Sequence, residues 1–443
     1  MDMILHSTNG ATAKVSLPEG VANGLSPDGG LYMPDIFPRL PQAFYNNLTD
    51  MSLQEIAYVI ANTLFGDLVE SSLLKKIVYD SLNFDIPLRH IGGDTFMLEL
   101  FHGPTKSFKD IGARFMARLL PVIDPVDENG RDIIVATSGD SGGAIANGFS
   151  RAANTRVFVL FPKDELERYQ IAQFTTERNV VAIEVNGSYD QCQAMVKEVL
   201  RTNAATLHDR RHITSGNSIN LLRQFASIIY FFHGYARALA ARPGQPVVIS
   251  VPCGNLGNLS AGLMAKRMGL PTKRFIAANN ANDVFVEYLQ TGGFSPKAAL
   301  MTIARAMDVG NPSNLARIID LYGGNLEHLR EDVEGVSLDD ETLAVTMRHL
   351  ADELDIVVEP QTAAAFAALH RKQRPGETGL VLACADPSKF AGTVERIIGH
   401  SVKMPHLQHS IRQLRDVRIV KIPPTLSALD RVMQLARRNH LAN

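Results

Sequence analysis

Short apolar runs alternate with helix-like segments over most of the chain beyond Asp132. In residues 131–149, RDIIVATSGDSGGAIANGF, a β-branched run leads through a glycine-containing turn into a segment with helical spacing. The same order recurs at residues 156–174, 179–200, 246–269 and 378–399. Strands that alternate with helices predict an open, mostly parallel α/β sheet, whose functional residues lie at the carboxyl ends of the strands.

The first 95 or so residues follow a different pattern. Residues 24–41, GLSPDGGLYMPDIFPRLP, are rich in turn formers, whereas residues 52–66, SLQEIAYVIANTLFG, have the apolar spacing of a helix. Residues 326–354 are charged and have helical spacing, which predicts a solvated peripheral element. The divisions that we expect are an N-terminal domain at 1–95, a core at 96–400 with a smaller subdomain at about 132–228, and a C-terminal segment at 401–443.

The composition excludes several classes of protein. The 443 residues are 45% hydrophobic and 20% charged, which is ordinary globular usage. The net charge of −2 leaves no basic excess for binding nucleic acid. No run approaches the roughly 18 apolar residues of a membrane span, and the N-terminus MDMILHSTNG lacks the pattern of a signal peptide. We therefore expect a cytoplasmic protein that binds neither nucleic acid nor membranes.

The cysteines do not indicate a structural framework. Cys192, Cys253 and Cys384 are far apart and form no CxxC pair. Their spacing predicts neither a set of disulfides nor a thiolate zinc site, and we expect no metal ion.

Two turns between a strand and a helix are candidates for binding anions. CGNLGN, residues 253–258, follows the apolar run VVISV, and its glycines let backbone N–H groups converge at the start of a helix. TSGDSGG, residues 137–143, offers small hydroxyls and amides that suit a carboxylate. Taken alone, each turn is equally compatible with a tight or N-capping turn of no functional role.

Two further features complete a possible site. The segment FHGPTKSFKDIG, residues 101–112, contains Lys106 and Lys109, either of which could be a nucleophile or an ordinary surface lysine. Cys384 follows the last predicted strand, where a buried structural cysteine is the alternative. A lysine amine, a phosphate loop, a carboxylate loop and a partner for a ring nitrogen together suit pyridoxal phosphate with an amino-acid substrate.

Several motifs resemble those of one family in the same order along the chain. HGPTKSFKD at 102–110 is similar to the HGPT-x-x-FKD segment of the threonine synthases, whose second lysine carries pyridoxal phosphate. Further counterparts are GLSPDGGLYMP (24–34), ATSGDSGGA (136–144), SGNSIN (215–220), VPCGNLGNLSAGL (251–263) and AMDVGNPSN (306–314). The resemblance runs from about residue 7 to about residue 400. It implies fold type II, the fold of the tryptophan synthase β-subunit group: two open, mostly parallel α/β subdomains with the cofactor between them, and an N-terminal domain of the threonine synthase type.

The resemblance also implies roles for particular residues. Lys109 would be the catalytic lysine that bonds to the cofactor, with Lys106 as a neighbour. The other cofactor-binding residues would be Phe108, Asp140, Gly254, Asn255, Leu256, Gly257, Asn258 and Cys384. The substrate-binding residues would be Ser138, Gly139, Ser141, Ser218, Asn220 and Arg223, the last of these binding the substrate phosphate unless it is only a surface arginine on its helix.

One loop departs from the family pattern. Where the family has Thr-Ala-His-Pro, with the threonine hydroxyl on the ring nitrogen, this chain has Cys384, Ala385, Asp386 and Pro387. A thiol is a weaker hydrogen-bond partner than a hydroxyl. We expect the Cys384 sulfur near the ring nitrogen and the Asp386 carboxylate turned away as an ordinary turn residue.

The implied reaction converts O-phospho-L-homoserine and water to L-threonine and inorganic phosphate, by γ-elimination and β-hydration, as the last step of threonine biosynthesis. The enzyme would be a lyase and a monomer or homodimer. One alternative is a serine or threonine dehydratase of the same fold, against which GLSPDGGLYMP argues. The other is a catalytically silent relative that binds a phosphorylated metabolite.

Overall fold

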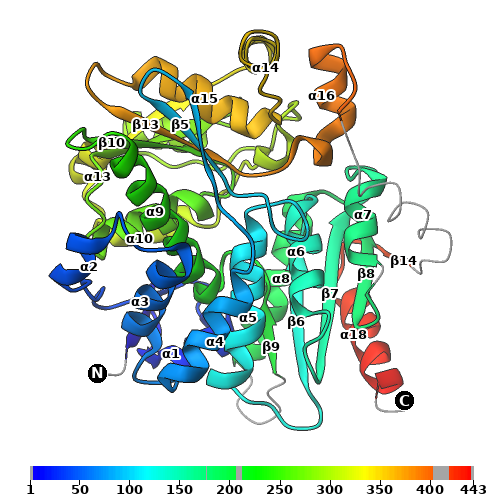
Figure 1. Cartoon of the computed structure of the whole chain (residues 1–443). Coiled ribbons are helices and arrows are strands. Elements are labelled where there is room, and N and C mark those ends of the chain that lie inside the picture. Colours follow the sequence, from blue (N-terminus) through cyan, green and yellow to red (C-terminus); the bar gives the residue numbers. More distant parts are fainter. Residues whose placement is uncertain (1–2, 176, 206–211, 403–418, 441–443) are drawn as a thin grey trace.

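Two mostly parallel sheets form the body of the molecule, and a smaller antiparallel sheet lies at its N-terminal end (Figure 1). The computed structural model describes residues 3–175, 177–205, 212–402 and 419–440. Within these residues the prediction of a mostly parallel α/β architecture is confirmed, since β4 alone runs antiparallel to its neighbour in the two larger sheets.

The larger sheet has six strands in the order β12-β11-β10-β13-β5-β4. These strands are β4 (Leu88–Gly92), β5 (Thr95–Glu99), β10 (Val247–Pro252), β11 (Arg274–Asn279), β12 (Val333–Ser337) and β13 (Thr378–Ala383). Every residue of the three central strands β10, β11 and β13 is buried. Helices cover both faces, which explains why these strands are continuous apolar runs and do not alternate. Among the helices in contact with the sheet are α15 (Pro360–Lys372), α9 (Leu221–Ala241) and α10 (Gly257–Arg267).

The smaller sheet has five parallel strands in the order β14-β8-β7-β6-β9. They are β6 (Arg131–Ala136), β7 (Thr155–Pro162), β8 (Val180–Val185), β9 (Ile213–Ser215) and β14 (Ile419–Ile422). Ile133 and Val157 face one apolar cluster with α6 (Asp140–Phe149), whereas Ile134 and Phe158 face another with α8 (Tyr189–Ala205). The two faces of this sheet therefore belong to different parts of the core.

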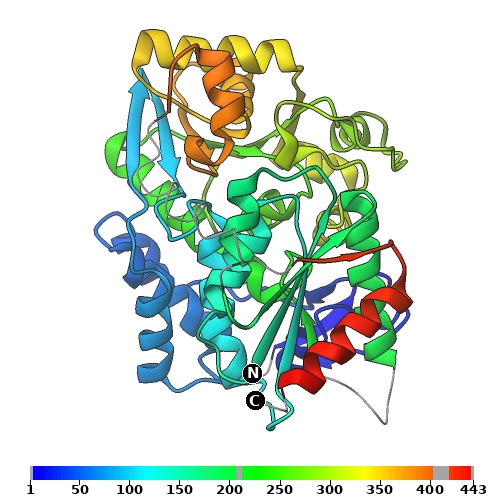
Figure 2. The same ribbon diagram turned by 90° about the vertical axis from the view of Figure 1, so that its right-hand side faces the viewer.

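The end of the chain joins this smaller sheet. β14 pairs in parallel with β8, and α18 (Leu426–His440) packs on α8 and β14, as Figure 2 shows for the terminal helix beside the strands. Leu429 and Met433 of α18 are buried in the same apolar cluster as Ile183 and Cys192. Much of the C-terminal segment that we expected from residue 401, namely residues 403–418, lies outside the described residues.

The N-terminal part is built on a short sheet and four helices. The sheet consists of β1 (Ile4–Ser7), β2 (Val15–Ser16) and β3 (Tyr32–Pro34), and the helices are α1 (Leu17–Asn23), α2 (Gln42–Asn47), α3 (Leu53–Phe65) and α4 (Ser71–Ser81). The helix predicted at residues 52–66 is confirmed as α3. Ser52 caps it and forms a capping box with Glu55. α3 packs on α9 and α4 packs on α5 (Lys109–Ile123), so this part supports the two helices behind the site.

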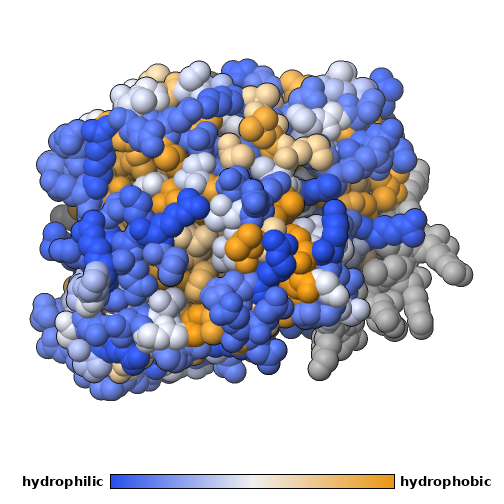
Figure 3. Space-filling model, turned by 90° about the horizontal axis from the view of Figure 1, so that it is seen from above, coloured by the Kyte–Doolittle hydropathy of each residue, from blue (hydrophilic) through white to orange (hydrophobic). Residues whose placement is uncertain are grey.

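The prediction for residues 326–354 was wrong in one respect. α13 (Leu326–Asp332) and α14 (Asp340–Leu354) are helical, but β12 between them is an edge strand that pairs with β11. The charged Glu334 in β12 forms ion pairs with Arg274 and Arg374, so its charge does not require a solvated helix. A five-residue strand is too short for its period to be seen within a helical pattern. The surface over α14 and its neighbours is mostly hydrophilic, with separate apolar patches (Figure 3).

The remaining elements connect these layers. They are α7 (Arg168–Thr175), α11 (Val284–Thr291), α12 (Leu315–Leu321), α16 (Ala391–Ile398) and the 3-10 turns η1 (Arg305–Met307) and η2 (Pro387–Phe390). No helix among the described residues is both long enough and apolar enough to cross a membrane.

His6 links the N-terminal sheet to α12 through charge. Its Nδ1 lies 2.8 Å from Asp35 and its Nε2 lies 2.9 Å from Asp320, and all three side chains are partly buried. Burial would lower the His6 pKa, but hydrogen bonds and charge from Asp320 and Asp35 raise it above its ordinary value of 6.5. Both nitrogens can donate at once only when the ring is protonated.

We therefore expect His6→Gln to destabilise the protein at low pH more than at high pH. The stabilisation by protonated His6 is complete below about pH 6.5 and is lost as the pH rises through the higher pKa of the folded protein. Urea unfolding at about pH 6 should show a loss of about 1 kcal/mol, with a smaller loss at about pH 9. His90→Gln is the control, at an exposed ring whose Nε2 lies 2.9 Å from the Gly93 carbonyl oxygen. An equal loss at both pH values would contradict the assignment.

Candidate active site

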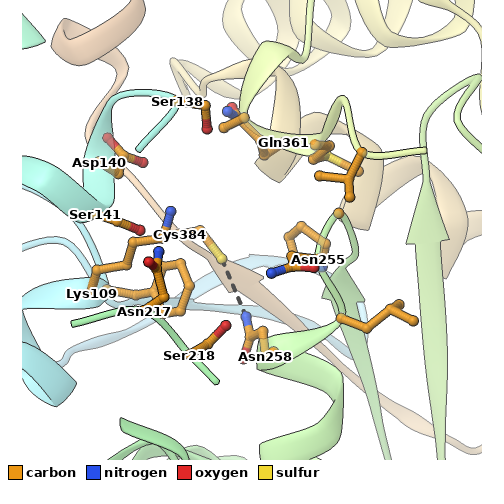
Figure 4. A pocket seen from close by; sticks show the side chains of 18 of the residues that line it. Lys109, Ser138, Asp140, Ser141, Asn217, Ser218, Asn255, Asn258, Gln361 and Cys384 are labelled. Atoms are coloured by element: carbon orange, nitrogen blue, oxygen red, sulfur yellow. Dashed lines mark hydrogen bonds between the residues drawn. The ribbon is translucent and has the colours of Figure 1, made fainter. Parts of the chain in front are cut away.

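A cavity lies between the two larger sheets, at the carboxyl ends of β6, β10 and β13 (Figure 4). Its walls enclose about 960 Å³ counted out to the open mouth. The predicted residues that line it are Phe108, Lys109, Ser138, Asp140, Ser141, Ser218, Arg223, Gly254, Asn255, Leu256, Gly257, Asn258 and Cys384. Motifs from widely separated parts of the chain therefore meet at one place.

Lys109, and not Lys106, is the lysine that faces this cavity. Lys109 is the first residue of α5 and its Nζ lies 5.6 Å from the centre of the Phe108 ring. Enclosure away from bulk water lowers the Lys109 pKa; Asp140 opposes this effect, and Arg223 and Lys389 add to it. Lys106 has a left-handed backbone (φ 60°) and its carbonyl accepts a hydrogen bond from the Asp386 amide. Lys106 therefore belongs to the turn that leads into α5.

The loop between β10 and α10 has the form of a phosphate site. Leu256 has a left-handed backbone (φ 56°), and α10 begins at Gly257 with no side chain capping its amides. A Cβ on Gly254 would lie 2.8 Å from the Met307 Cα, and one on Gly257 would lie 2.9 Å from the Ser218 Oγ. The helix start thus presents free N–H groups and a partial positive charge to the cavity.

Asn255 and Asn258 hold this loop against its surroundings. The Asn255 Oδ1 accepts a hydrogen bond from the Ser313 amide, and the Asn255 carbonyl accepts one from the Asn314 side chain. Asn258 accepts a hydrogen bond of 2.6 Å from the Tyr230 hydroxyl and donates to the Cys384 sulfur at 3.5 Å, the contact drawn in Figure 4. The loop and the cysteine are therefore positioned together.

Cys384 is a neutral thiol in the cavity wall. Burial, with a contribution from Glu359, raises its pKa well above the ordinary value of a thiol. The Asp386 carboxylate accepts a hydrogen bond from the Ser388 amide at 2.9 Å and caps η2. Asp386 does not line the cavity, as we expected of a turn residue.

The loop after β6 is held in shape by hydrogen bonds between its own residues. The Thr137 hydroxyl accepts hydrogen bonds of 2.9 Å from the amides of Gly139 and Gly142, and α6 begins at Asp140 without a side-chain cap. Ser138 and Ser141 face the cavity, whereas Gly139 is not in its lining. Gly139 has φ 136°, and a Cβ there would lie 2.2 Å from Gln170. The role of Gly139 is therefore to let the chain turn between the two serines.

The segment from Ser218 into the first turn of α9 contributes two of its three predicted residues. Ser218 lines the cavity, and buried Arg223 reaches it with one N–H donating to the Gly216 carbonyl at 2.6 Å. Burial lowers the Arg223 pKa to about 10, so the guanidinium remains charged. Contrary to the prediction, Asn220 does not line the cavity: its amide group donates to the Val21 carbonyl, and its oxygen caps α9 at Leu222. A side chain that caps a buried helix in this way has no polar group left for substrate.

Other residues at or beside the site were not predicted. Asn217, Gln361 and Tyr189 line the cavity, and the buried Gln361 Oε1 has no hydrogen-bond partner among the described residues. Glu359 and Lys389 lie just behind the wall, and burial raises the Glu359 pKa to about 8. Asn217 lies in the SGNSIN motif at 215–220 but was not assigned a role there, and the other residues lie in segments for which the sequence offered no role.

These groups fit pyridoxal phosphate. A lysine whose pKa is lowered by burial suits the cofactor aldehyde, the start of α10 suits its phosphate, and the Cys384 thiol suits its ring nitrogen. At Gly254 and Gly257 the backbone packs so closely on Met307 and Ser218 that a side chain would displace the loop.

Two family models match the chain: "Pyridoxal-phosphate dependent enzyme" at residues 85–385 and "Threonine synthase N terminus" at residues 5–82. The threonine synthases of Serratia marcescens and Escherichia coli (strain K12) are 38% and 37% identical to it over 404 residues, which are 91% of this chain and 92% and 93% of those proteins. The chain belongs to the threonine synthase family. The expected resemblance, enzyme class and cofactor are confirmed.

Solved structures of this family agree in fold. The crystal structure of threonine synthase from Escherichia coli matches with a TM-score of 0.89 and 35% identity, covering 98% of this chain and all (100%) of that one. The structure of PLP-bound threonine synthase from Brucella melitensis matches with a TM-score of 0.87 and 27% identity, covering 98% and 99%. A solved threonine deaminase, at 18% identity and a TM-score of 0.52, shares the fold type II core over 71% of this chain and 96% of its own.

The first test of the site distinguishes its two lysines. Lys109→Ala should abolish the visible absorbance of covalently bound cofactor, because the cavity then holds no amine for the aldehyde. Lys106→Ala is the matched control and should retain the absorbance. Borohydride reduction followed by peptide mapping should label Lys109; a label on Lys106 would overturn the assignment.

The second test addresses the phosphate loop. Gly254→Val or Gly257→Val should raise the cofactor dissociation constant at least about tenfold, a loss of about 1.4 kcal/mol, because the added carbons displace the backbone from the anion. Gly293→Ala is the control, since the nearest atom to its added Cβ is 3.7 Å away. Cofactor titration followed by absorbance gives the constants, and wild-type affinity in both loop variants would refute the assignment.

Proposed function

We propose that this enzyme converts O-phospho-L-homoserine and water to L-threonine and inorganic phosphate, by γ-elimination and β-hydration, as the last step of threonine biosynthesis. The observation that carries the proposal is a cavity with one desolvated lysine and two positions for anions, the start of α10 and Arg223. A cofactor phosphate needs the first position. A substrate whose leaving group is also phosphate needs the second.

Lys109 acts as the base and acid of the reaction. Burial lowers its pKa, which increases the share of uncharged amine, and this amine can accept the α-proton of the substrate and return it later. Bound pyridoxal phosphate supplies the electron sink that makes this proton acidic. The position of Lys109 at the first turn of α5, against Phe108, keeps the amine inside the cavity.

The substrate is oriented by groups from both subdomains. The hydroxyls of Ser138 and Ser141 and the amides of Asp140 and Ser141 at the start of α6 bind its carboxylate, whereas Thr137 takes the Gly142 amide. Arg223 binds the substrate phosphate, because its planar fork of donors suits that anion. Its burial strengthens this contact, since few water molecules compete for the guanidinium.

Cys384 binds the ring nitrogen as a neutral group. Because the thiol does not carry charge, it does not enforce protonation of the ring. Asn258 supports this arrangement by holding the sulfur from one side while Tyr230 holds Asn258. The reaction then depends mainly on proton transfer by Lys109 and on the departure of phosphate, and not on a protonated ring.

Other features of the enzyme remain predictions. We propose a cytoplasmic location, for which the three buried free cysteines are suited. We propose a monomer or homodimer, and we keep the domain divisions near residues 95 and 400. The family match to residues 5–82 supports an N-terminal domain of the threonine synthase type.

A comparison of activities tests the function. The purified enzyme with pyridoxal phosphate should release inorganic phosphate from O-phospho-L-homoserine and form L-threonine, while releasing little ammonia from L-serine or L-threonine. Lys109→Ala should show neither activity. Ammonia release that exceeds phosphate release would indicate a dehydratase, and absence of both activities from a protein that binds the cofactor would indicate a metabolite-binding relative.

A further inference from the structure

Lys389 is a fully buried lysine that no step of the proposed reaction uses. It lies in η2, beyond Cys384 in the same loop, and none of its surface is exposed. An ammonium group without water must have partners for its charge and its three N–H donors. The Lys389 Nζ lies 3.0 Å from the Asp140 Oδ1, and it donates to the Thr105 carbonyl at 2.8 Å and to the Gln173 Oε1 at 2.7 Å.

These partners come from three separate segments around the site. Thr105 precedes Lys109 in the turn that leads to α5, Asp140 begins α6, and Gln173 lies in α7. Gln173 also donates to the Thr105 carbonyl at 3.0 Å, so the network is closed. Lys389 therefore connects the loop after β13, which carries Cys384, to the first turn of α6 in the smaller subdomain.

Asp140 lies between two lysines. Its carboxylate is in the cavity lining, where Figure 4 shows it with Lys109, and Lys389 contacts it from behind the wall. Burial alone would raise the Asp140 pKa, but Lys389 and then Lys109 lower it, so the group is ionised. One carboxylate is thus available to two amines, and only one of them has to stay uncharged for the proposed reaction.

We propose that Lys389 is a positioning residue that occupies the Asp140 carboxylate, so that this carboxylate does not pair with Lys109 and the Lys109 amine stays free to accept a proton. The contact at 3.0 Å and the two further hydrogen bonds hold the Lys389 ammonium on the far side of Asp140. Without Lys389, Asp140 would be a buried anion whose remaining cationic partner is Lys109. Such a carboxylate would stabilise the charged form of Lys109.

Other charged groups around Lys109 do not replace Lys389. Arg223 lowers the Lys109 pKa, but its N–H groups donate to the carbonyls of Gly216 and Lys109 and not to Asp140. Asp110 is bound by the amide and hydroxyl of Thr105. Glu359, Cys384 and Tyr169 have raised pKa values, which leave them largely or wholly uncharged at neutral pH.

The test measures the Lys109 pKa in the full-length protein without added cofactor. The rate at which an amine-modifying reagent labels Lys109 is followed against pH by mass spectrometry of its peptide. Lys389→Met, which is similar in length but uncharged, should raise the pH midpoint of Lys109 labelling by about one pH unit or more. At a fixed pH below the midpoint, labelling should therefore be roughly tenfold slower. Lys389→Arg, which keeps the charge, should stay close to the wild type. In the enzyme with cofactor, the acidic limb of the kcat profile, which reports the enzyme–substrate complex in which the Lys109 amine is free, should also move upward in the methionine variant.

A second lysine provides a matched control. Lys266 also contacts one carboxylate, Asp332 at 2.9 Å, and two backbone carbonyls, but it is not in the cavity lining. Lys266→Met should leave the Lys109 midpoint unchanged. If Lys389→Met does not fold, Lys389→Gln, which can still donate to Thr105 or Gln173, should give the same shift.

The proposal is overturned if Lys109 titrates at the same pH in the wild type and the uncharged variants. It is also overturned if Lys389→Arg shifts the midpoint as far as Lys389→Met, since the role would then be packing alone. The inference rests on the proposed role of Lys109 as the base. The labelling measurement does not depend on the substrate, however. If the enzyme failed to convert O-phospho-L-homoserine, the labelling result would still show whether Lys389 controls the titration of Lys109.

Discussion

Desolvation of the Lys109 amine is the effect on which the site depends, because a lysine in water is protonated at neutral pH and has no lone pair to share. The cavity walls lower the Lys109 pKa, and the charges of Arg223 and Lys389 act in the same direction. Asp140 acts in the opposite direction and would restore the proton if it faced Lys109 alone. The positions of the surrounding charges follow from this requirement: each buried ion beside Lys109 has a partner elsewhere.

The two anion-binding loops use the backbone and not additional side-chain charge. α6 and α10 both begin at the cavity after a residue whose side chain does not cap them, so their first amides are directed at a ligand, although Thr137 takes the Gly142 amide. This arrangement adds no full positive charge, apart from Arg223, to a site whose lysine has to remain neutral. A side chain at Gly254 or Gly257 would clash with Met307 or Ser218 and displace the loop, which would move its amides from their position at the cavity.

In each of the two larger sheets the parallel strands end on one edge. The loops after β6 and β10 line the same cavity, so these two edges face each other across it. β6 and β10 lie in different sheets, and their helices α6 and α10 approach the cavity from opposite sides. The N-terminal helices α3 and α4 support α9 and α5, which carry Arg223 and Lys109. β14 and α18 complete the outer edge of the smaller sheet, on the side of α8. The N-terminal helices, β14 and α18 contain no catalytic residue, but they help to fix the position of the segments that do.

Local sequence was sufficient for the features that depend on neighbouring residues. The strand–turn–helix order from Asp132 onward, the helix α3, and the glycine loops at Gly139, Gly254 and Gly257 could be read from short segments, since period and turn chemistry are local properties. The choice of Lys109 over Lys106 came from the resemblance to the threonine synthases, because nothing within the segment itself distinguishes the two lysines. The short strand β12 was missed within its charged surroundings, because it pairs with a strand that is distant in the sequence.

Only the tertiary structure decided which polar groups share a partner. Asn220 has the same kind of side chain as Asn217, yet its amide is used by Val21 and the start of α9, while Asn217 lines the cavity. Lys389 and Gln361 lie in segments without a functional motif, and their importance arises from Asp140 and from the cavity itself. Burial and charge pairing depend on atoms that are distant in the chain and adjacent in space, and no local pattern records that proximity.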